Sequence, residues 1–426
     1  MSLMSFTLIF AALLIAQSLT RLYLSSRQMR YVSKHRTQVP SEFAEKISLH
    51  SHQRAADYTV ARQKILMFEI VFDAIVLIVL TLMGGLNWIN QELSELISAD
   101  IWYQVALVLS VFMLSDIIGL PFTLYRTFVL EQKFGFNRMT PKLFILDSVK
   151  KLVLSLVIGV PILYALFALI NWLYSPQWWL WAWIALCVLS IVFMYAIPKF
   201  IMPLFNKFTP LENAEINERV NALAERANFG LGGLYVMDSS KRSAHGNAFF
   251  TGFGKNRRIV FFDTLLNKLK PAEIEAVLAH ELGHFKHKHI IKRIALSFIM
   301  SFIFFALLGY LINQPWFYGG LGVFLQPDRP MFGIALVLLL LVLPVFTFFI
   351  TPISSFMSRK DEFEADRYAV EQTNSDDLIS ALVKLYNDNA ATLTPDPVHS
   401  RFYDSHPPAS IRIQHLHATQ RIIHAG

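Results

Sequence analysis

Apolar residues along this chain gather in seven long runs separated by polar segments. The runs cover Phe6–Leu24, Leu66–Leu86, Ile101–Leu120, Leu152–Leu173, Trp178–Pro198, Ile294–Ile312 and Met331–Ile350. A helix needs about 20 apolar residues to cross the hydrocarbon core of a bilayer, and each run is near that length. The pattern therefore predicts a mainly α-helical, seven-span membrane protein.

Basic residues give these spans a direction. The loops between spans one and two and between spans three and four are rich in Lys and Arg, whereas residues 87–100 and 171–177 contain neither. Because cytosolic loops carry the positive charge, we expect the N-terminus outside and the C-terminus inside. The first run is followed rather than preceded by arginines, which predicts an uncleaved anchor.

Composition supports the membrane interpretation and limits the classes of binding partner to expect. Hydrophobic residues make up 54% of the chain and charged residues only 16%, against about a quarter charged in soluble proteins. The net charge of +7 lies in loops between spans rather than along one face, so we expect a lipid bilayer as partner and no nucleic acid. The single cysteine, Cys187, excludes an internal disulfide and a thiolate metal site.

The two large polar segments look folded. We expect helices at Glu212–Asn228, from Pro271 onward, at Ser358–Glu371 and after an N-cap at Ser375, and strands at Leu234–Met237, Ala248–Phe253 and Arg258–Phe262. The predicted division is residues 1–198 (spans one to five), 199–293 (cytosolic catalytic module), 294–350 (spans six and seven) and 351–426 (cytosolic C-terminal segment). The fold class is thus a helical membrane bundle with a small α/β module.

The sharpest chemical signal is the sequence His280-Glu281-Leu282-Gly283-His284. Two histidines four residues apart lie on one helix face and can ligate one zinc ion. Glu281 between them projects towards the metal, where it can take a proton from bound water. The alternative is an exposed His-rich helix. The position of the motif in a helix next to the membrane favours zinc.

A catalytic zinc needs a third protein ligand and an open position. Glu362 is the best candidate ligand, and Asp366, one turn later, can accept the spare N–H of a ligand histidine. The alternative is a solvated charged helix. Further along, His406 and Arg412 are candidates to stabilise an oxyanion, although a loop histidine is as often a surface residue.

Other titratable residues have less specific interpretations. His287 and His289 are read as part of a basic rim at the membrane surface rather than as ligands. Four acids lie in or beside the spans, and they indicate either a hydrated interior or pairing with nearby Lys64, Arg126 or Lys150. These acids are Glu69, Asp73, Asp116 and Asp147.

Several longer motifs occur in one order along most of the chain. They are EQKFGFN at 131–137, MPLFNKFTPL at 202–211, SAHGNAFFTGFG at 243–254, HELGH at 280–284, the stretch 358–366 and SHP at 405–407. In these motifs the chain resembles the CAAX prenyl protease 1 family, the type I CAAX zinc metalloproteases of the endoplasmic reticulum and their prokaryotic relatives.

The resemblance implies one zinc ion per chain, held by His280, His284 and Glu362, with Glu281 as catalytic base. It implies a catalytic or orienting part for Asp366. Asn247 matches a position that holds the substrate backbone along an edge strand, and His406 matches a residue that contacts the reacting carbonyl. It also implies a seven-helix barrel around a chamber, with a zincin-like module at the cytosolic end.

The implied activity is removal of a C-terminal tripeptide from prenylated proteins, and no oligomer is required. Two alternatives stay open: a membrane quality-control protease without prenyl specificity, and a non-proteolytic scaffold or channel stabilised by zinc. The C-terminal residues Arg421–Gly426 contain no retrieval signal for the endoplasmic reticulum. We therefore expect a prokaryotic inner membrane, or the endoplasmic reticulum if the source is eukaryotic.

Overall fold

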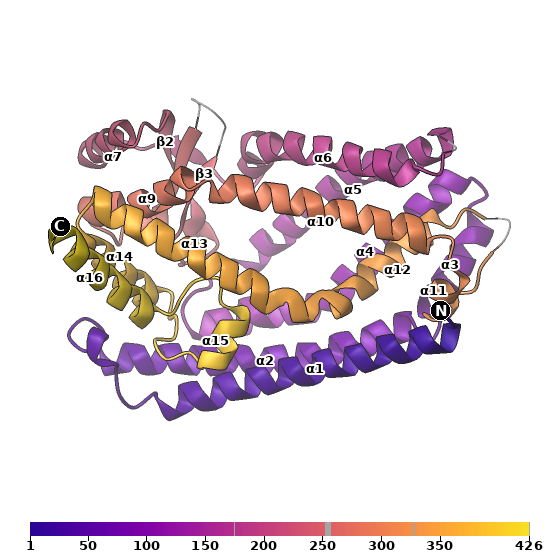
Figure 1. Ribbon diagram of the computed structural model, residues 1–426, viewed down its shortest axis with the longest axis horizontal. Helices are drawn as coiled ribbons and strands as arrows, with labels where there is room; N and C mark the ends of the chain where they lie inside the picture. Colours follow the sequence, from indigo (N-terminus) through magenta and orange to yellow (C-terminus); the bar gives the residue numbers. More distant parts are fainter. Residues whose placement is uncertain (174, 252–256, 327–328, 426) are drawn as a thin grey trace.

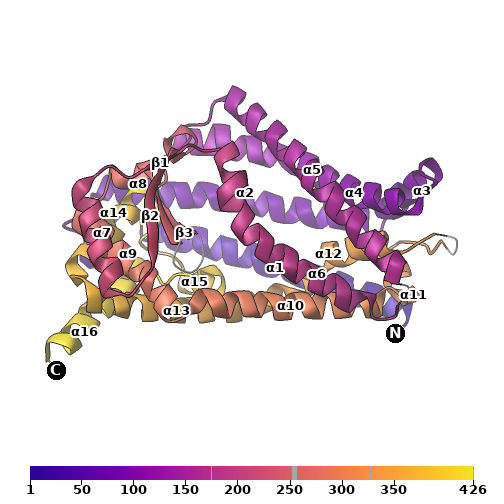
Figure 2. The same ribbon diagram turned by 90° about the horizontal axis from the view of Figure 1, so that it is seen from above.

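Long helices run side by side along the longest axis of the molecule, and a small α/β module lies at one end (Figures 1 and 2). The computed structural model describes residues 1–426 except 174, 252–256, 327–328 and 426. The N-terminus lies at the far end of the bundle, and the C-terminal helix lies in the module. The two ends of the chain are therefore separated along the direction of the spans.

The bundle contains a helix or helical stretch for each predicted span. Its elements are α1 (Leu3–Lys34), α2 (Leu49–Leu80), α3 (Gly85–Leu96), α4 (Asp100–Tyr125) with the π-helical turn η2 (Arg126–Glu131), α5 (Pro141–Leu173), α6 (Trp178–Ala196) with η3 (Ile197–Ile201) and η4 (Met202–Leu204), α10 (His289–Leu311), α11 (Pro315–Gly319) and α12 (Phe332–Thr347) with η6 (Phe348–Ile350). Within the described residues, 6 stretches are long and apolar enough to span a membrane, and α2 with α3 makes a seventh if this pair, bent by 49°, counts as one.

The second predicted span ends earlier than its apolar pattern suggested. α2 stops at Leu80, and Gly84, with φ +78°, turns the chain into α3. The hydropathy pattern does not reveal the break between α2 and α3, because most residues around the break are apolar. The segment expected as a loop after Leu86 is instead an amphipathic helix, whose apolar side packs into the bundle core.

Helix α12 packs against α1, α4 and α10, and most of its side chains are buried. By contrast, α5 and α6 expose large apolar residues along their length, including Val153, Val157, Ile191 and Val192. An apolar outer surface of this kind is what a helix bundle presents to lipid tails.

The module combines a four-stranded sheet with helices from both polar segments. The strands are β1 (Phe208–Pro210), β2 (Leu231–Met237), β3 (Ala248–Thr251) and β4 (Arg257–Phe262), in the order β1-β2-β4-β3, with β2 and β4 parallel and the outer pairs antiparallel. The helices are α7 (Ala214–Arg226), α8 (Asp263–Leu266), α9 (Pro271–Lys286), α13 (Thr351–Gln372), α14 (Ser375–Asp388), α15 (Pro397–Tyr403) and α16 (Ala409–Ala425), with short 3-10 turns η1 (Ser41–Phe43) and η5 (Ser239–Lys241).

The three predicted strands are confirmed, except that Gly252 and Phe253 of the second lie outside the described residues. The predicted N-cap at Ser375 is wrong. Asn374 caps α14 through its side chain, which accepts from the amide of Asp376, while the Ser375 hydroxyl donates to Gln420. Either residue type suits an N-cap, and the sequence alone did not choose between neighbours.

The loop between α1 and α2 packs against the module. Phe43 and Ile47 belong to the same buried cluster as the core of the α/β module. Arg27 on α1 donates two hydrogen bonds, of 3.1 and 3.0 Å, to the carboxylate of Asp396 before α15. The first basic loop and the module therefore share one end of the molecule, as the predicted topology requires.

Candidate metal centre and active site

Three side chains of metal-binding type converge from two helices. His280 and His284 on α9 and Glu362 on α13 offer ligand atoms that all lie within 4.8 Å of one another. Nε2 of His280 lies 3.4 Å from Glu362 Oε2, and Nε2 of His284 lies 3.3 Å from Glu362 Oε1. Ligand atoms about 2.05 Å from a tetrahedral ion are roughly 3.3 Å apart. The cluster thus has the dimensions of a metal site.

The burial of Glu362 supports the same conclusion. The residue is 2% exposed, and within the described part of the chain its Oε2 atom is buried without a hydrogen bond. An unsatisfied buried carboxylate oxygen is costly unless something else binds it. Two imidazole nitrogens and this carboxylate therefore fit a divalent metal ion.

A close helix contact brings the ligands together. A Cβ on Gly283 would lie 2.8 Å from the Cα of Ala365 and 3.0 Å from its carbonyl oxygen. Only a residue without a side chain allows α9 and α13 to approach this closely. The glycine of the HELGH sequence thus sets the distance between the two histidines and Glu362.

Asp366 and Arg412 form a second layer behind His280. Asp366 Oδ1 lies 2.9 Å from His280 Nδ1, and Arg412 donates to both carboxylate oxygens of Asp366. Burial lowers the pKa of His280, but hydrogen bonds to Asp366 and Glu362 outweigh it and raise the pKa to about 9. The carboxylates therefore favour a positive charge at this place, and a metal ion can supply that charge.

Arg412 sits deeper than a direct substrate contact requires. The residue is only 5% exposed, and its guanidinium group is engaged in the bidentate pair with Asp366. One edge still lines the pocket beside Glu281. The geometry therefore favours a role for Arg412 in holding Asp366. Its predicted contact with substrate stays a prediction.

Glu281 faces a cavity of about 300 Å³ next to the cluster. Asn247, which immediately precedes the edge strand β3, lies on the wall of the same cavity. Its side-chain oxygen accepts from the amide of Ala248, and its carbonyl accepts from the amide of Phe262. The outer side of β3 has no strand partner among the described residues, so an extended peptide can pair there.

His406 reaches the cluster from the loop between α15 and α16. Its Nε2 atom lies 3.4 Å from Glu362 Oε1, and its side chain is 61% exposed. It lines the small cavity and also a larger one. A polar group with this placement can contact a substrate carbonyl near the metal.

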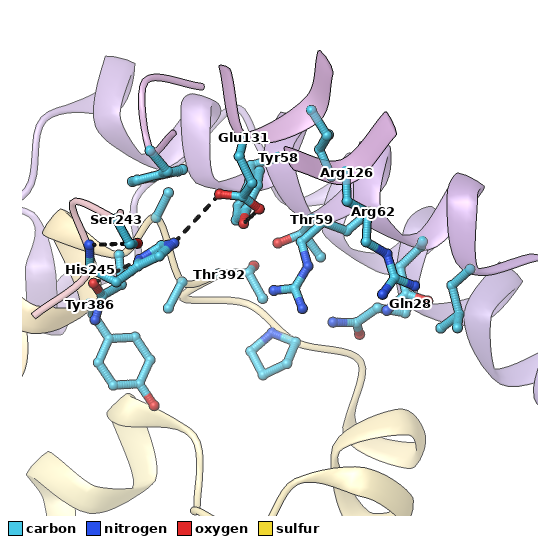
Figure 3. A pocket seen from close by; sticks show the side chains of 18 of the residues that line it. Gln28, Tyr58, Thr59, Arg62, Arg126, Glu131, Ser243, His245, Tyr386 and Thr392 are labelled. Atoms are coloured by element: carbon cyan, nitrogen blue, oxygen red, sulfur yellow. Dashed lines mark hydrogen bonds and ion pairs between the residues drawn. The ribbon is translucent and has the colours of Figure 1, made fainter. Parts of the chain in front are cut away.

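The larger cavity, of about 1090 Å³, extends between the bundle helices and shares Tyr386, Asn389, Ala391 and His406 with the smaller one. Figure 3 shows the side chains along its wall, where a dashed line joins His245 to Glu131; the two lie 3.6 Å apart. The cavity beside the metal-binding cluster therefore adjoins a larger cavity that is lined by residues of α1, α2 and η2 as well as by the module.

Comparisons with known proteins agree along nearly the whole chain. The model of the CAAX prenyl protease N-terminal region with five membrane helices matches residues 28–207, and the Peptidase family M48 model matches residues 210–420. CAAX prenyl protease 1 of Saccharomyces cerevisiae is 34% identical over 96% of this chain and 94% of that protein. The chain belongs to the CAAX prenyl protease 1 family. The homolog of Homo sapiens is 30% identical, covering 92% of this chain and 91% of that protein.

A solved structure supports the same assignment. The crystal structure of S. mikatae Ste24p matches with a TM-score of 0.89 and 32% identity, covering 96% of this chain and 99% of that one. This member of the CAAX prenyl protease 1 family is therefore a multi-span membrane metalloprotease with a helical bundle and a small peptidase module. The expected fold and enzyme class are confirmed, and the alternative of a non-proteolytic scaffold loses its support.

Two of the acids beside the spans are paired in this family member. Glu69 accepts from Arg126, one of the three basic residues that the sequence suggested as partners. Asp147 accepts 2.8 and 3.1 Å hydrogen bonds from Arg242, which comes from the module rather than from a neighbouring loop. Pairing thus accounts for these two acids, whereas Asp73 and Asp116 are exposed on the helices.

Sequence reasoning missed two residues near the site. Tyr386 lines both cavities, but nothing in the amphipathic pattern of α14 singles it out. His289 was assigned to a surface rim, yet it is fully buried with Nδ1 2.9 Å from His284 Nδ1. The only available signal was its position five residues after a predicted ligand.

Proposed function

We propose that this protein is a zinc endopeptidase that removes the C-terminal tripeptide from prenylated proteins. The relatives named above are CAAX prenyl proteases, which supports this substrate class. The observation that carries the proposal is the cluster of His280, His284 and Glu362 beside Glu281, next to a cavity that adjoins a larger one lined by bundle helices.

Zinc is the ion that suits this donor set. Two imidazole nitrogens and one carboxylate, with a fourth position left for water or substrate, are typical of catalytic zinc. When bound, zinc supplies Lewis-acid chemistry, which polarises the scissile carbonyl and lowers the pKa of water towards neutrality.

The chain's own residues perform the remaining tasks. Glu281 takes a proton from the attacking water and returns it to the leaving amine. Asp366 accepts the outer N–H of His280 and so fixes its ring, and Arg412 fixes Asp366. His406 donates to the oxygen of the reacting carbonyl. Asn247 and the free edge of β3 hold the substrate backbone in an extended form.

We place this module, residues 199–293 and 351–426, on the cytosolic side, because it shares one end of the molecule with the basic loop before α2. The membrane is the prokaryotic inner membrane, or the endoplasmic reticulum in a eukaryotic source. The prenyl group rests among the spans while the peptide reaches the cluster. One chain supplies every ligand, so no oligomer is required.

The test uses the full-length protein, purified in detergent, with farnesylated and unprenylated peptides that end in a CAAX sequence. Wild type should bind one zinc ion and cleave the farnesylated peptide at the bond before the last three residues. Glu281→Gln should keep the zinc and lose about 10²–10⁴-fold in turnover. Glu362→Ala should lose the zinc.

Glu275→Gln is the matched control, since Glu275 lies on the same helix but pairs with Arg219 and Arg226 on the module surface. It should cleave like wild type. Tight zinc in Glu362→Ala would remove the third ligand from the proposal. Cleavage of unprenylated membrane proteins alone would replace the substrate class with general membrane proteolysis.

A further inference from the structure

His289 is buried behind the metal-binding cluster although it lies three residues beyond the end of α9. It is 0% exposed and begins α10. Lys288 before it has φ +58°, a left-handed conformation that is uncommon for a residue with a side chain. This turn ends α9 and directs the imidazole of His289 back towards His284, with 2.9 Å between their Nδ1 atoms.

The protonation states in this contact follow from the cluster. His284 faces Glu362 with Nε2, so the proton of the neutral ring lies on Nδ1 and is donated outward. His289 must then accept with Nδ1 and carry its own proton on Nε2. That nitrogen lies 3.1 Å from Glu364 Oε2, a carboxylate that can accept it. Each hydrogen bond in the chain therefore has one donor and one acceptor.

We propose that His289 is a positioning residue for the metal centre. The chain His284–His289–Glu364 fixes the ring plane and tautomer of His284, just as Asp366 with Arg412 fixes His280. Each histidine ligand thus has its own outer partner. Asp366, the partner of His280, lies on α13, and His289, the partner of His284, is hydrogen-bonded to Glu364 on the same helix. The inference depends on the proposed zinc site and adds a determinant of metal affinity outside the ligand set.

The same residues invite a second interpretation. His289, Asp361 and Glu364 also lie within metal-binding distance of one another. Most of the atoms that could bind an ion, however, already have partners: Arg293 lies 3.5 Å from Asp361, and His289 uses both ring nitrogens. Within the described residues this group has no buried side-chain atom without a hydrogen bond, unlike Glu362 Oε2. The geometry therefore favours a hydrogen-bonded chain over a second ion.

The experiment measures zinc affinity by competition with a chelator, zinc stoichiometry, and the visible spectrum of the Co²⁺-substituted protein. His289→Ala should weaken zinc binding about 10–100-fold, as loss of an outer partner does, and should change the Co²⁺ spectrum. His289→Asn can still accept from His284 and should recover most of the affinity. His287→Ala is the matched control, because this neighbouring imidazole is 40% exposed and lies 3.9 Å from Glu364; it should bind zinc like wild type.

Wild-type affinity and spectrum in His289→Ala would overturn the inference, as would two zinc ions per wild-type chain with one lost in His289→Ala. If His289→Ala does not fold, Glu364→Ala and Glu364→Gln replace it, since Glu364 is 36% exposed. The glutamine should bind zinc more tightly than the alanine, and equal affinities would refute the chain. Absence of zinc from the wild type would instead refute the proposed function.

Discussion

Gly283→Ala tests whether the contact between α9 and α13 sets the metal geometry. The new Cβ would lie 2.8 Å from the Cα of Ala365, whereas carbon atoms in contact prefer about 3.5–4.0 Å. The helices must therefore separate by about 0.7–1.2 Å at this point. Metal–ligand distances tolerate only about 0.2 Å. The substitution should pull Glu362 away from the two histidines.

Two opposite terms act on the stability of the folded protein, and only the second can change the zinc affinity. Replacing glycine by alanine inside a helix stabilises it by about 0.5–1 kcal/mol, while overpacking a close contact costs about 1–3 kcal/mol. The clash involves backbone atoms of a fully buried residue, so no flexible side chain can relieve it. If release of the metal relaxes the strain, zinc affinity should fall about 5–150-fold.

The assay is zinc competition together with thermal unfolding at saturating zinc. Gly119→Ala in α4 is the matched control, because a Cβ there meets nothing within 4 Å. This control should keep its zinc affinity and gain about 0.5–1 kcal/mol of stability, because nothing offsets the helix preference of alanine. Gly283→Ala with the affinity and unfolding temperature of wild type would show that α13 adapts without cost, and the reasoning on the close contact would be wrong.

Three further changes test other parts of the structure. Burial raises the pKa of Glu273, but hydrogen bonds, chiefly the one from Lys384, outweigh burial and hold the pKa below its usual value. Glu273→Gln should therefore lower the unfolding temperature at pH 7. The difference from wild type should shrink as the pH falls through the range in which carboxyl groups are protonated. Lys288→Gly should raise the unfolding free energy by about 0.5–1 kcal/mol in denaturant titrations, because relief of about 1–2 kcal/mol of left-handed strain outweighs the entropy cost of glycine, about 0.5–1 kcal/mol. Arg412→Ala should cost about 3–5 kcal/mol by leaving the buried Asp366 unpaired, and Arg412→Lys should restore only part of this, since lysine cannot form the bidentate pair.

Local periodicity predicted much of this molecule. The apolar runs located the spans, because spanning a bilayer demands a continuous stretch that no other element needs. The spacing of His280 and His284 placed both rings on one helix face before any tertiary information. Glu362 could be predicted as a ligand because it lies four residues before Asp366, in a helical pattern within the polar segment after the last span.

Long-range contacts and single backbone conformations lay beyond that reasoning. The direction of the His289 side chain depends on the left-handed φ of Lys288. No sequence pattern predicts this conformation for a lysine. The bidentate grip of Arg412 on Asp366 joins residues 46 positions apart, and it exists only after α16 packs on α13. Sequence spacing did not report the burial of Arg412, and its predicted substrate contact stays a prediction.

The path of the chain explains why the peptidase module and the spans act as one unit. α9 passes into α10 through the turn at Lys288, and α13 follows α12 through the short turn η6. Glu362 thus follows the two histidines only after the chain has crossed the bundle twice, through α10 and α12. Among the candidate spans, the stretch that contains α12 and leads to Glu362 is the most buried. The position of Glu362 relative to the two histidines therefore depends on the packing of α12 against α1, α4 and α10 as well as on the contact at Gly283. Residues 199–293 alone contain two ligands and the base, but not the carboxylate that completes the centre.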